Sequence, residues 1–148
     1  MKIALAADHG GFELKEHLKQ KIKSLGHEMI DLGCSSAESV DYPDYGLDAA
    51  KLVSRGEADR AILLCKSGIG MSIVANKVHG VRGALCIDEN MAESSRRHND
   101  ANVLILSANY LDQVKADKIV GKWLVTDFEG GRHQRRIEKI TEFEKNQS

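Results

Sequence analysis

Short apolar runs alternate along this chain with longer segments in which apolar residues recur every three or four positions. Five runs interrupt the polar sequence, at residues 3–7, 28–32, 61–65, 83–87 and 103–106. Runs this short and this continuously apolar are typical of strands buried on both faces, as in a parallel sheet. The pattern therefore predicts five parallel strands.

The segments between the runs have the period of amphipathic helices. In the first segment, Leu14, Leu18 and Ile22 recur at helical spacing, and Gly26 is placed to end the helix. A helix after the last strand is expected to have Asn109 as its N-cap. Further helices are predicted near residues 45–53, 70–78, 88–97, 116–123 and 132–145.

Strands that alternate with helices join through right-handed crossovers and form layered α/β folds. Because the β-α unit repeats about five times, we predict a Rossmann-like, three-layer α/β/α sandwich with a parallel sheet of about five strands. No linker, repeat or change of composition divides the chain, which predicts a single domain over residues 1–148. The helix near 132–145 has no further strand to feed, so we expect it to pack on a partner subunit.

Composition and charge narrow the class of protein. The 148 residues are 42% hydrophobic and 29% charged, a balance that excludes a disordered chain. The net charge of −1 disfavours nucleic-acid binding, and no apolar run approaches the roughly 20 residues of a membrane span. The chain starts with a strand pattern rather than a signal peptide, and its three cysteines form no C-x-x-C pair. A cytoplasmic protein is expected, because unpaired cysteines suit a reducing compartment.

Residues that directly follow the predicted strands are candidates for chemistry, because ligands of open parallel sheets bind beyond the carboxyl ends of the strands. The richest segment is 65–70, in which Cys65 ends a strand and Ser67, Gly68 and Gly70 lead into a helix. Glycines let backbone N–H groups approach a ligand closely, and a helix N-terminus favours negative charge. The loop could hold a phosphate or stabilise an oxyanion, or its glycines could serve the packing of a tight turn alone.

Several common motifs are absent from the sequence. The glycines at 68 and 70 lack the third glycine of a dinucleotide fingerprint, and there is no P-loop run. A cysteine-dependent phosphatase would have an arginine six residues after the thiol, where this chain has Met71. No two histidines have metal-ligand spacing, so catalysis or anion binding is favoured over zinc.

Histidines and arginines mark further candidate positions. His9 follows the first predicted strand, and His98 lies in the polar segment 96–100 just before another strand. Arg132 and Arg136 are four positions apart and share one face of the predicted last helix. Two guanidinium groups there could clamp a phosphate, and the alternative is a solvated basic start of the helix.

Six segments of the chain form a specific combination, in this order and across nearly the whole length: Ala6-x-Asp8-His9-x-Gly11-Phe12-x-Leu14-Lys15, Asp41-Tyr42-Pro43-Asp44-Tyr45, Cys65-x-Ser67-Gly68-Ile69-Gly70-Met71-Ser72, Ala75-Asn76-Lys77, Arg97-His98-Asn99-Asp100 and Glu129-Gly130-Gly131-Arg132-His133. In these segments the chain resembles the ribose-5-phosphate isomerase B family, which also includes the galactose-6-phosphate isomerase subunits. The resemblance implies an aldose–ketose isomerase without metal or cofactor. Such an enzyme interconverts D-ribose 5-phosphate and D-ribulose 5-phosphate, in the pentose phosphate pathway, through a cis-enediolate.

The resemblance also implies roles for individual residues. Cys65 would be the base that moves the proton between C1 and C2, with Ser67 assisting, and His98 would be the acid that opens the furanose ring. Backbone amides of the loop would stabilise the enediolate oxygen, polar side chains would position hydroxyls, and cations would hold the phosphate. The implied substrate-binding residues are Asp8, His9, Lys66, Ser67, Gly68, Ile69, Gly70, Asn99, Asn109, Arg132 and Arg136.

Two of these positions depart from the family's pattern. Position 66 is usually a small residue in the family and is Lys66 here, where a cation could favour the thiolate of Cys65 or its bulk could disturb the loop. Position 109 is often arginine in the family and is Asn109 here, which removes a cation from near the substrate. Neither change removes a proposed catalytic group.

The order of elements separates the two main catalytic candidates. Cys65 ends a strand whereas His98 precedes one, so within one subunit they should lie at opposite edges of the sheet. We therefore expect a homodimer, or a dimer of dimers, with active sites built across the subunit interface.

Two other interpretations stay open. The chain could isomerise a six-carbon phosphosugar, such as allose 6-phosphate or galactose 6-phosphate. It could also be a non-catalytic phosphosugar-binding module, although binding alone needs neither Cys65 nor His98.

Overall fold

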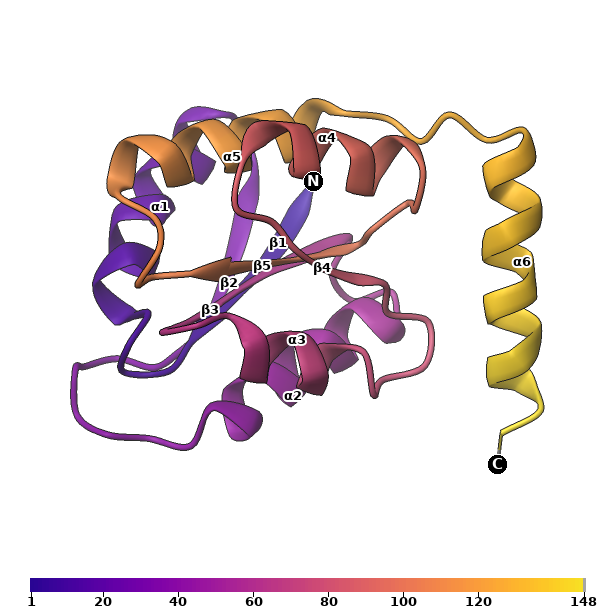
Figure 1. Cartoon of the computed structure of the whole chain (residues 1–148). Helices are drawn as coiled ribbons and strands as arrows, with labels where there is room; N and C mark the ends of the chain where they lie inside the picture. The colour runs from indigo at the N-terminus through magenta and orange to yellow at the C-terminus, as the bar shows by residue number, and fades with distance from the viewer. Residues whose placement is uncertain (148) are drawn as a thin grey trace.

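A single parallel sheet of five strands runs through the middle of the protein (Figure 1). The computed structural model describes residues 1–147, and the strands lie in the order β2-β1-β3-β5-β4. All four strand pairs are parallel, as the apolar runs predicted. The strands are β1 (Lys2–Ala7), β2 (Glu28–Gly33), β3 (Arg60–Cys65), β4 (Gly83–Leu85) and β5 (Val103–Ser107).

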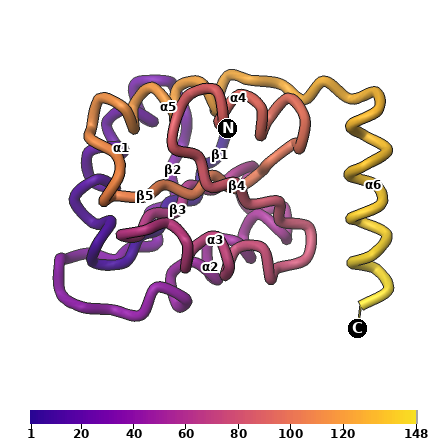
Figure 2. The backbone as a smooth tube through the Cα atoms, viewed as in Figure 1, coloured from indigo at the N-terminus to yellow at the C-terminus, as the bar shows by residue number. Residues whose placement is uncertain are grey.

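Helices cover both faces of this sheet and confirm the three-layer α/β/α prediction (Figures 1 and 2). On one face lie α1 (Phe12–Ser24), α4 (Glu89–Arg97) and α5 (Gln113–Val125), and on the other lie α2 (Tyr42–Ser54) and α3 (Ile69–Ala75). A sixth helix, α6 (Arg132–Lys145), matches the predicted range near 132–145.

The sheet is buried on both faces, which is why its strands are continuously apolar. Side chains alternate along β1, so that Ile3 and Leu5 join the core formed with α1 and α5, and Ala4 joins the core formed with α2. The first core includes Trp123 of α5, which is fully buried. The two cores hold the central strands rigidly, and the ends of those strands position the loops that follow them.

The ends of the helices depend on short-range hydrogen bonds. Gly26 has a φ of +85° directly after the last turn of α1, a conformation that glycine adopts without strain, as expected from the sequence. The N-cap of α5 is Asp112, whose carboxylate accepts a hydrogen bond at 2.7 Å from the backbone N–H of Lys115. The prediction of Asn109 as this N-cap is therefore wrong, because a carboxylate three positions later caps the helix instead.

The last helix stands beside the layered body, at the end of the sheet where β4 begins (Figures 1 and 2). A groove of about 320 Å³ separates them, lined on one side by Ile137 and Ile140 of α6 and on the other by Val81 and Ala84. Ile140 and Phe143 of α6 are 52% and 64% exposed. Among residues 1–147, no helix is both long enough and apolar enough to cross a membrane.

Candidate active site

The thiol of Cys65 lies at the carboxyl end of the central strand β3, where the chain turns into α3. Its side chain is buried, and the backbone N–H of Gly68 donates a hydrogen bond to Sγ at 3.2 Å. The hydroxyl oxygen of Ser67 accepts a hydrogen bond from the backbone N–H of Ile69 at 3.1 Å. The thiol and the hydroxyl of this turn therefore lie against its backbone amides, and such donors suit chemistry that develops negative charge.

Close packing explains the two glycines of this loop. Gly68 has a φ of +80°, and a Cβ added there would lie 2.5 Å from Cδ1 of Leu85. A Cβ at Gly70 would lie 2.7 Å from the ring of Tyr42, which packs over the loop. The packing interpretation and the ligand-binding interpretation of the glycines are thus compatible. Tyr42 belongs to one of the sequence segments described above, but no local sequence pattern predicts that its ring lies here.

Asp8 and His9 follow the neighbouring strand β1 and lie at the same edge. Oδ1 of the buried Asp8 accepts hydrogen bonds from the backbone N–H groups of Gly10 at 2.9 Å and Gly11 at 3.3 Å. Nδ1 of His9 accepts a hydrogen bond from the backbone N–H of Val40 at 3.2 Å. This bond places the proton of a neutral His9 ring on Nε2, where it is available to a ligand.

Lys66 crosses the edge from β3 towards β1. A Cβ added to Gly10 would lie 2.3 Å from Cγ of Lys66 and 3.3 Å from Oδ1 of Asp8, so the stem of the lysine packs on Gly10 near that carboxylate. The backbone carbonyl of Lys66 accepts hydrogen bonds from the N–H of Asn109 at 3.0 Å and the hydroxyl of Ser107 at 2.7 Å. The two positions that depart from the family's pattern are therefore direct neighbours.

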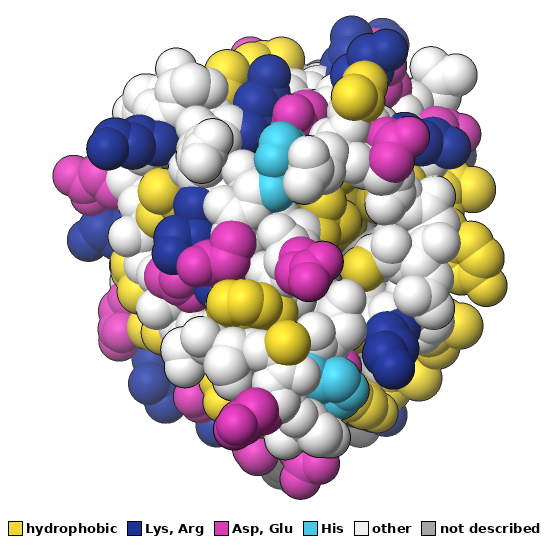
Figure 3. Space-filling model, turned by 90° about the vertical axis from the view of Figure 1, so that its left-hand side faces the viewer, with side chains coloured by type: hydrophobic (Ala, Val, Ile, Leu, Met, Phe, Trp, Pro, Cys, Tyr) yellow, Lys and Arg dark blue, Asp and Glu magenta, His cyan; other side chains and the backbone are white. Residues whose placement is uncertain are grey.

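These residues form one group, which we call the thiol edge. It consists of Asp8, His9, the loop 65–70 and Asn109. Figure 3 looks onto this side of the molecule, where acidic and basic side chains lie interspersed and neither sign forms a continuous patch.

The remaining candidates form a second group at the other end of the strands, which we call the histidine edge. It consists of His98, Asn99, Arg132 and Arg136. His98 follows α4 and is exposed, and its ring stacks on the ring of His133 in α6, with centroids 4.5 Å apart. Arg132 and Arg136 lie in the first turns of α6 on one face, and both are exposed.

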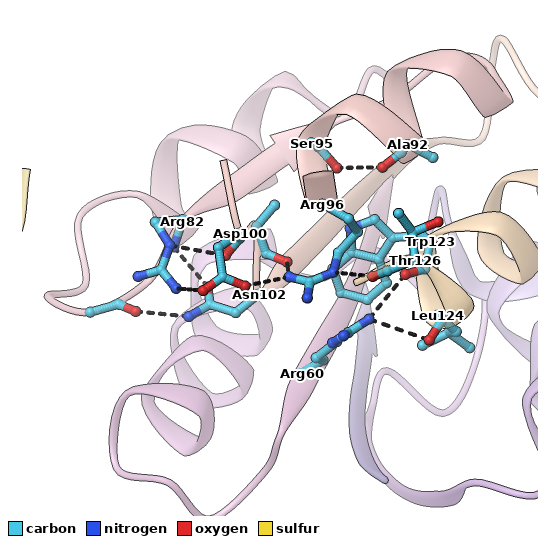
Figure 4. Close-up of polar contacts among 12 residues, drawn as sticks. Arg60, Arg82, Ala92, Ser95, Arg96, Asp100, Asn102, Trp123, Leu124 and Thr126 are labelled. Carbon is cyan, nitrogen blue, oxygen red and sulfur yellow. Dashed lines mark hydrogen bonds and ion pairs between the residues drawn. The ribbon is translucent and has the colours of Figure 1, made fainter. Parts of the chain in front are cut away.

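A network of charged side chains around the buried Arg96 holds the turn that carries His98 and Asn99 (Figure 4). Arg96 donates to Oδ1 of Asp100 at 2.8 Å, to the carbonyl of Ala101 at 2.7 Å and to the carbonyl of Thr126 at 3.0 Å. Arg82 donates from the other side to the backbone carbonyl of Asp100 at 2.9 Å. Asp100 has a φ of +46°, so this turn is fixed in a conformation that few residues other than glycine adopt.

The length of the sheet separates the two edges. In the pairing of β3 with β5, Ala61 faces Val103 at one end and Cys65 faces Ser107 four residues later. Four steps of a strand span about 13 Å. Because His98 precedes β5 and Cys65 ends β3, the two side chains lie at opposite ends of the strands, as the order of elements predicted.

The histidine edge also contains a group of potential metal ligands that sequence spacing did not reveal. One ligand atom each from His98, Glu129 and His133 lies within 4.8 Å of the others. Glu129 and His133 are four residues apart, but His98 is brought to them by the packing of α4 against the α5–α6 connection. His133 occurs in a segment used for the resemblance, yet nothing in the sequence predicted its contact with His98.

Comparison with known families identifies the type of protein. The chain matches the Ribose/Galactose Isomerase family over residues 3–140. It belongs to this family. The matched range includes the residues of the thiol edge and those of the histidine edge.

Members of the isomerase family resemble this chain over its full length. The ribose-5-phosphate isomerase B of Escherichia coli is 44% identical over 143 residues, which cover 97% of this chain and 96% of that protein. The structure of ribose-5-phosphate isomerase B from Clostridium thermocellum is 49% identical, covers 100% of both chains and has a TM-score of 0.97. The enzyme from Mycoplasma genitalium, solved with bound ribulose-5-phosphate, is 40% identical, covers 98% of this chain and 97% of its own, and has a TM-score of 0.95.

Proposed function

We propose that this chain is a ribose-5-phosphate isomerase of the B type, which interconverts D-ribose 5-phosphate and D-ribulose 5-phosphate. The observation that carries this assignment is the buried thiol of Cys65, which faces the amides of its loop in a chain similar throughout to an enzyme solved with ribulose-5-phosphate. An aldose–ketose isomerase needs a base that moves one proton between adjacent carbons and donors that stabilise the enediolate formed between the two transfers.

In this proposal Cys65 is the base. Its thiolate removes the proton from C2 of the open-chain aldose and returns it to C1 by way of a cis-enediolate, while the hydroxyl proton on O2 passes to O1. The backbone N–H groups of the loop, from Ser67 through Ile69 to Gly70, stabilise the enediolate oxygen, and the hydroxyl of Ser67 assists. The hydrogen bond from the backbone N–H of Gly68 to Sγ supports this role, because it holds the sulfur next to the backbone of the loop.

His98 opens the furanose ring before that step. It donates a proton to the ring oxygen while the bond from that oxygen to C1 breaks, and the C1 hydroxyl gives its proton to water as it becomes the aldehyde. An imidazole changes its charge near neutral pH, which suits this role. Asp8 and Asn99 position the hydroxyl groups of the sugar.

The phosphate binds to donors from both edges. His9 offers Nε2–H, since its Nδ1 accepts from Val40. Arg132 and Arg136 lie on one face of α6 and have no carboxylate partner among residues 1–147, so their guanidinium groups are available to an anion. Lys66 and Asn109 complete the substrate contacts from the thiol edge.

A complete site then requires two subunits. The thiol edge and the histidine edge are at opposite ends of the strands, so the thiol edge of one subunit meets the histidine edge of its partner in a homodimer or a dimer of dimers. Each chain of 148 residues is a single domain whose helix α6 packs on the partner. The exposed apolar side chains Ile140 and Phe143 on α6 support this contact. A cytoplasmic location fits the three free cysteines.

The experiment that tests the function is an assay of ribose 5-phosphate and ribulose 5-phosphate interconversion in the presence of EDTA, beside the variant Cys65→Ala. We expect turnover to survive chelation and to fall by about 10³-fold or more in the variant, because the base is lost. Wild-type protein that binds ribose 5-phosphate without turnover would support a binding module. Turnover of allose 6-phosphate alone would support a six-carbon isomerase.

A further inference from the structure

The exposed ring of His98 rests on a buried ring that has no role in the mechanism described above. The ring of His133 is parallel to that of His98 within 19°, with a centroid separation of 4.5 Å, and its side chain is only 9% exposed. The pair therefore consists of a solvent-facing imidazole on a fixed aromatic support.

The support itself is held by a chain of charged contacts. Nε2 of His133 lies 3.6 Å from Oε2 of Glu129. The other carboxylate oxygen of Glu129 pairs with the guanidinium of Arg97, which directly precedes His98. The backbone N–H of Glu129 also donates to the carbonyl of Arg97 at 3.1 Å. These contacts tie the start of α6 to the end of α4 at the point where His98 projects.

The same three side chains could be interpreted as a metal site, but their geometry argues against it. The lone pair of a metal-bound imidazole lies in the plane of the ring and points at the metal. Two stacked, nearly parallel rings cannot both point at one ion without separating. In addition, the carboxylate of Glu129 already accepts a hydrogen bond from the guanidinium of Arg97.

We propose that His133 is a positioning residue for His98, and that Glu129 and Arg97 keep His133 in place. This inference rests on the proposed function, in which His98 donates the proton that opens the furanose ring. A histidine at the end of a helix, with its ring in solvent, would otherwise sample several rotamers. The stack selects one of them, so that the imidazole is presented to the partner's thiol edge in a single orientation.

The charge state of the pair agrees with this arrangement. Desolvation lowers the pKa of His133, and the positive charges of His98 and Arg132 lower it further, whereas Glu129 acts in the opposite direction. This lowered pKa favours the neutral form of the His133 ring. A neutral aromatic ring beneath an imidazolium is also electrostatically favourable.

The test compares three substitutions of the supporting residue. His133→Phe keeps an aromatic ring under His98, whereas His133→Leu fills the space without a ring and His133→Ala leaves it empty. Gln134→Ala, at the next and exposed position of α6, is the matched control. Each variant is first checked for folding by circular dichroism and thermal unfolding, and its kcat and KM for ribose 5-phosphate are then measured.

We expect kcat for ribose 5-phosphate to fall by about 10- to 100-fold in the Leu and Ala variants and by less than about threefold in the Phe variant. Equal losses of kcat in His133→Phe and His133→Leu would overturn the proposal. An unchanged kcat in all three variants would overturn it too. If the role of His133 were purely structural, the melting temperatures of His133→Phe and His133→Leu would fall in proportion to their loss of activity.

A second readout separates ring opening from proton transfer. Ribulose 5-phosphate is open-chain, because its C5 oxygen carries the phosphate, so exchange of its C1 proton with D₂O needs the base but no ring opening. We expect His133→Leu to retain exchange within about twofold of the wild type while it loses ribose 5-phosphate turnover. If exchange and turnover fall together, the role of His133 is not in positioning His98.

His98→Asn distinguishes a failure of this inference from a failure of the proposed function. If His98→Asn turns over ribose 5-phosphate at the wild-type rate, His98 is not the ring-opening acid, and the role proposed for the histidine edge is refuted. If that variant loses turnover but His133→Leu does not, the ring-opening role stands and only the positioning role is refuted.

Discussion

At the scale of single residues, burial decides how Cys86 responds to pH. The thiol lies just after β4 and is 1% exposed. Burial raises its pKa from 9.0 to about 11, because a thiolate loses its hydration in the core. The folded protein therefore holds this proton more tightly than the unfolded chain, and the stability that follows is present in full below pH 9.

The first prediction concerns this thiol. As the pH rises from about 9 to about 11, the unfolded thiol ionises while the folded one does not, so the free energy of unfolding should fall by about 3 kcal/mol. Cys86→Ala should lower stability at neutral pH but flatten this alkaline decline. Urea unfolding of both proteins between pH 8 and pH 11 measures the difference, and two parallel curves would contradict the raised pKa.

Lys66 carries a second prediction at this scale, because it is an exposed cation beside the proposed base. Lys66→Met keeps the stem that packs on Gly10 but removes the charge. If the ammonium attracts the substrate's phosphate, KM for ribose 5-phosphate should rise about 3- to 10-fold with little change in kcat. The effect should shrink between about 20 mM and 200 mM salt, since exposed charges are screened. A KM that does not change at low salt would rule out this contribution.

At the scale of elements, the end of α4 shows how two adjacent arginines can have different roles. Arg96 is 5% exposed and donates to Asp100 and to the carbonyls of Ala101 and Thr126, so it joins α4 to β5 and to the end of α5. Arg97 is exposed and pairs with carboxylates at the surface. The hydrogen bonds of the buried Arg96 contribute more to stability than the ion pairs of Arg97. If Arg96 is removed, the carbonyls that it bonds lose their donor, and no water takes its place.

This contrast predicts different costs for the same substitution. Arg96→Met should lower the free energy of unfolding by about 3 kcal/mol, because buried acceptors and part of the Asp100 carboxylate lose their donor. Arg97→Met should lower it by less than about 1 kcal/mol, as is usual for an exposed ion pair. Urea unfolding at pH 7 compares the two, and a larger loss in Arg97→Met would show that the surface contacts hold the turn.

At the scale of the whole molecule, the parallel direction of the strands divides the candidate residues into two groups. Every loop that follows a strand lies at one end of the sheet, and every loop that precedes a strand lies at the other (Figure 1). Cys65 and His98 belong to loops of different kinds. A pairing of subunits that brings opposite ends together is the simplest way to unite them.

A subunit-mixing experiment tests this arrangement. Cys65→Ala and His98→Asn should each be inactive alone, but a mixture that is unfolded and refolded together should recover about a quarter of the wild-type activity. Half of the dimers formed at random contain one subunit of each kind, and one of the two sites in such a dimer has both residues intact. Activity that stays at the level of the separate variants, with mixed dimers demonstrated by a tag on one chain, would contradict a shared site.

The sequence by itself determined the elements and the family of this protein. Buried parallel strands must be apolar on both faces, so the continuous apolar runs, such as the one that begins at Ile3, marked the strands. The helices were marked by apolar residues that recur every three or four positions. The position of Cys65 at a strand end, and of His98 before a strand, also followed from chain order alone. These inferences succeeded because each depends on residues close together in the chain.

Only the tertiary structure decided the contacts between distant segments. The strand order β2-β1-β3-β5-β4 and the place of α6 beside the start of β4 depend on how whole elements pack. The contact of Lys66 with Gly10 and the stack of His98 on His133 join segments that no local pattern relates. Local signals specify which elements form, whereas the support beneath His98 exists because packing brings α4 and α6 together.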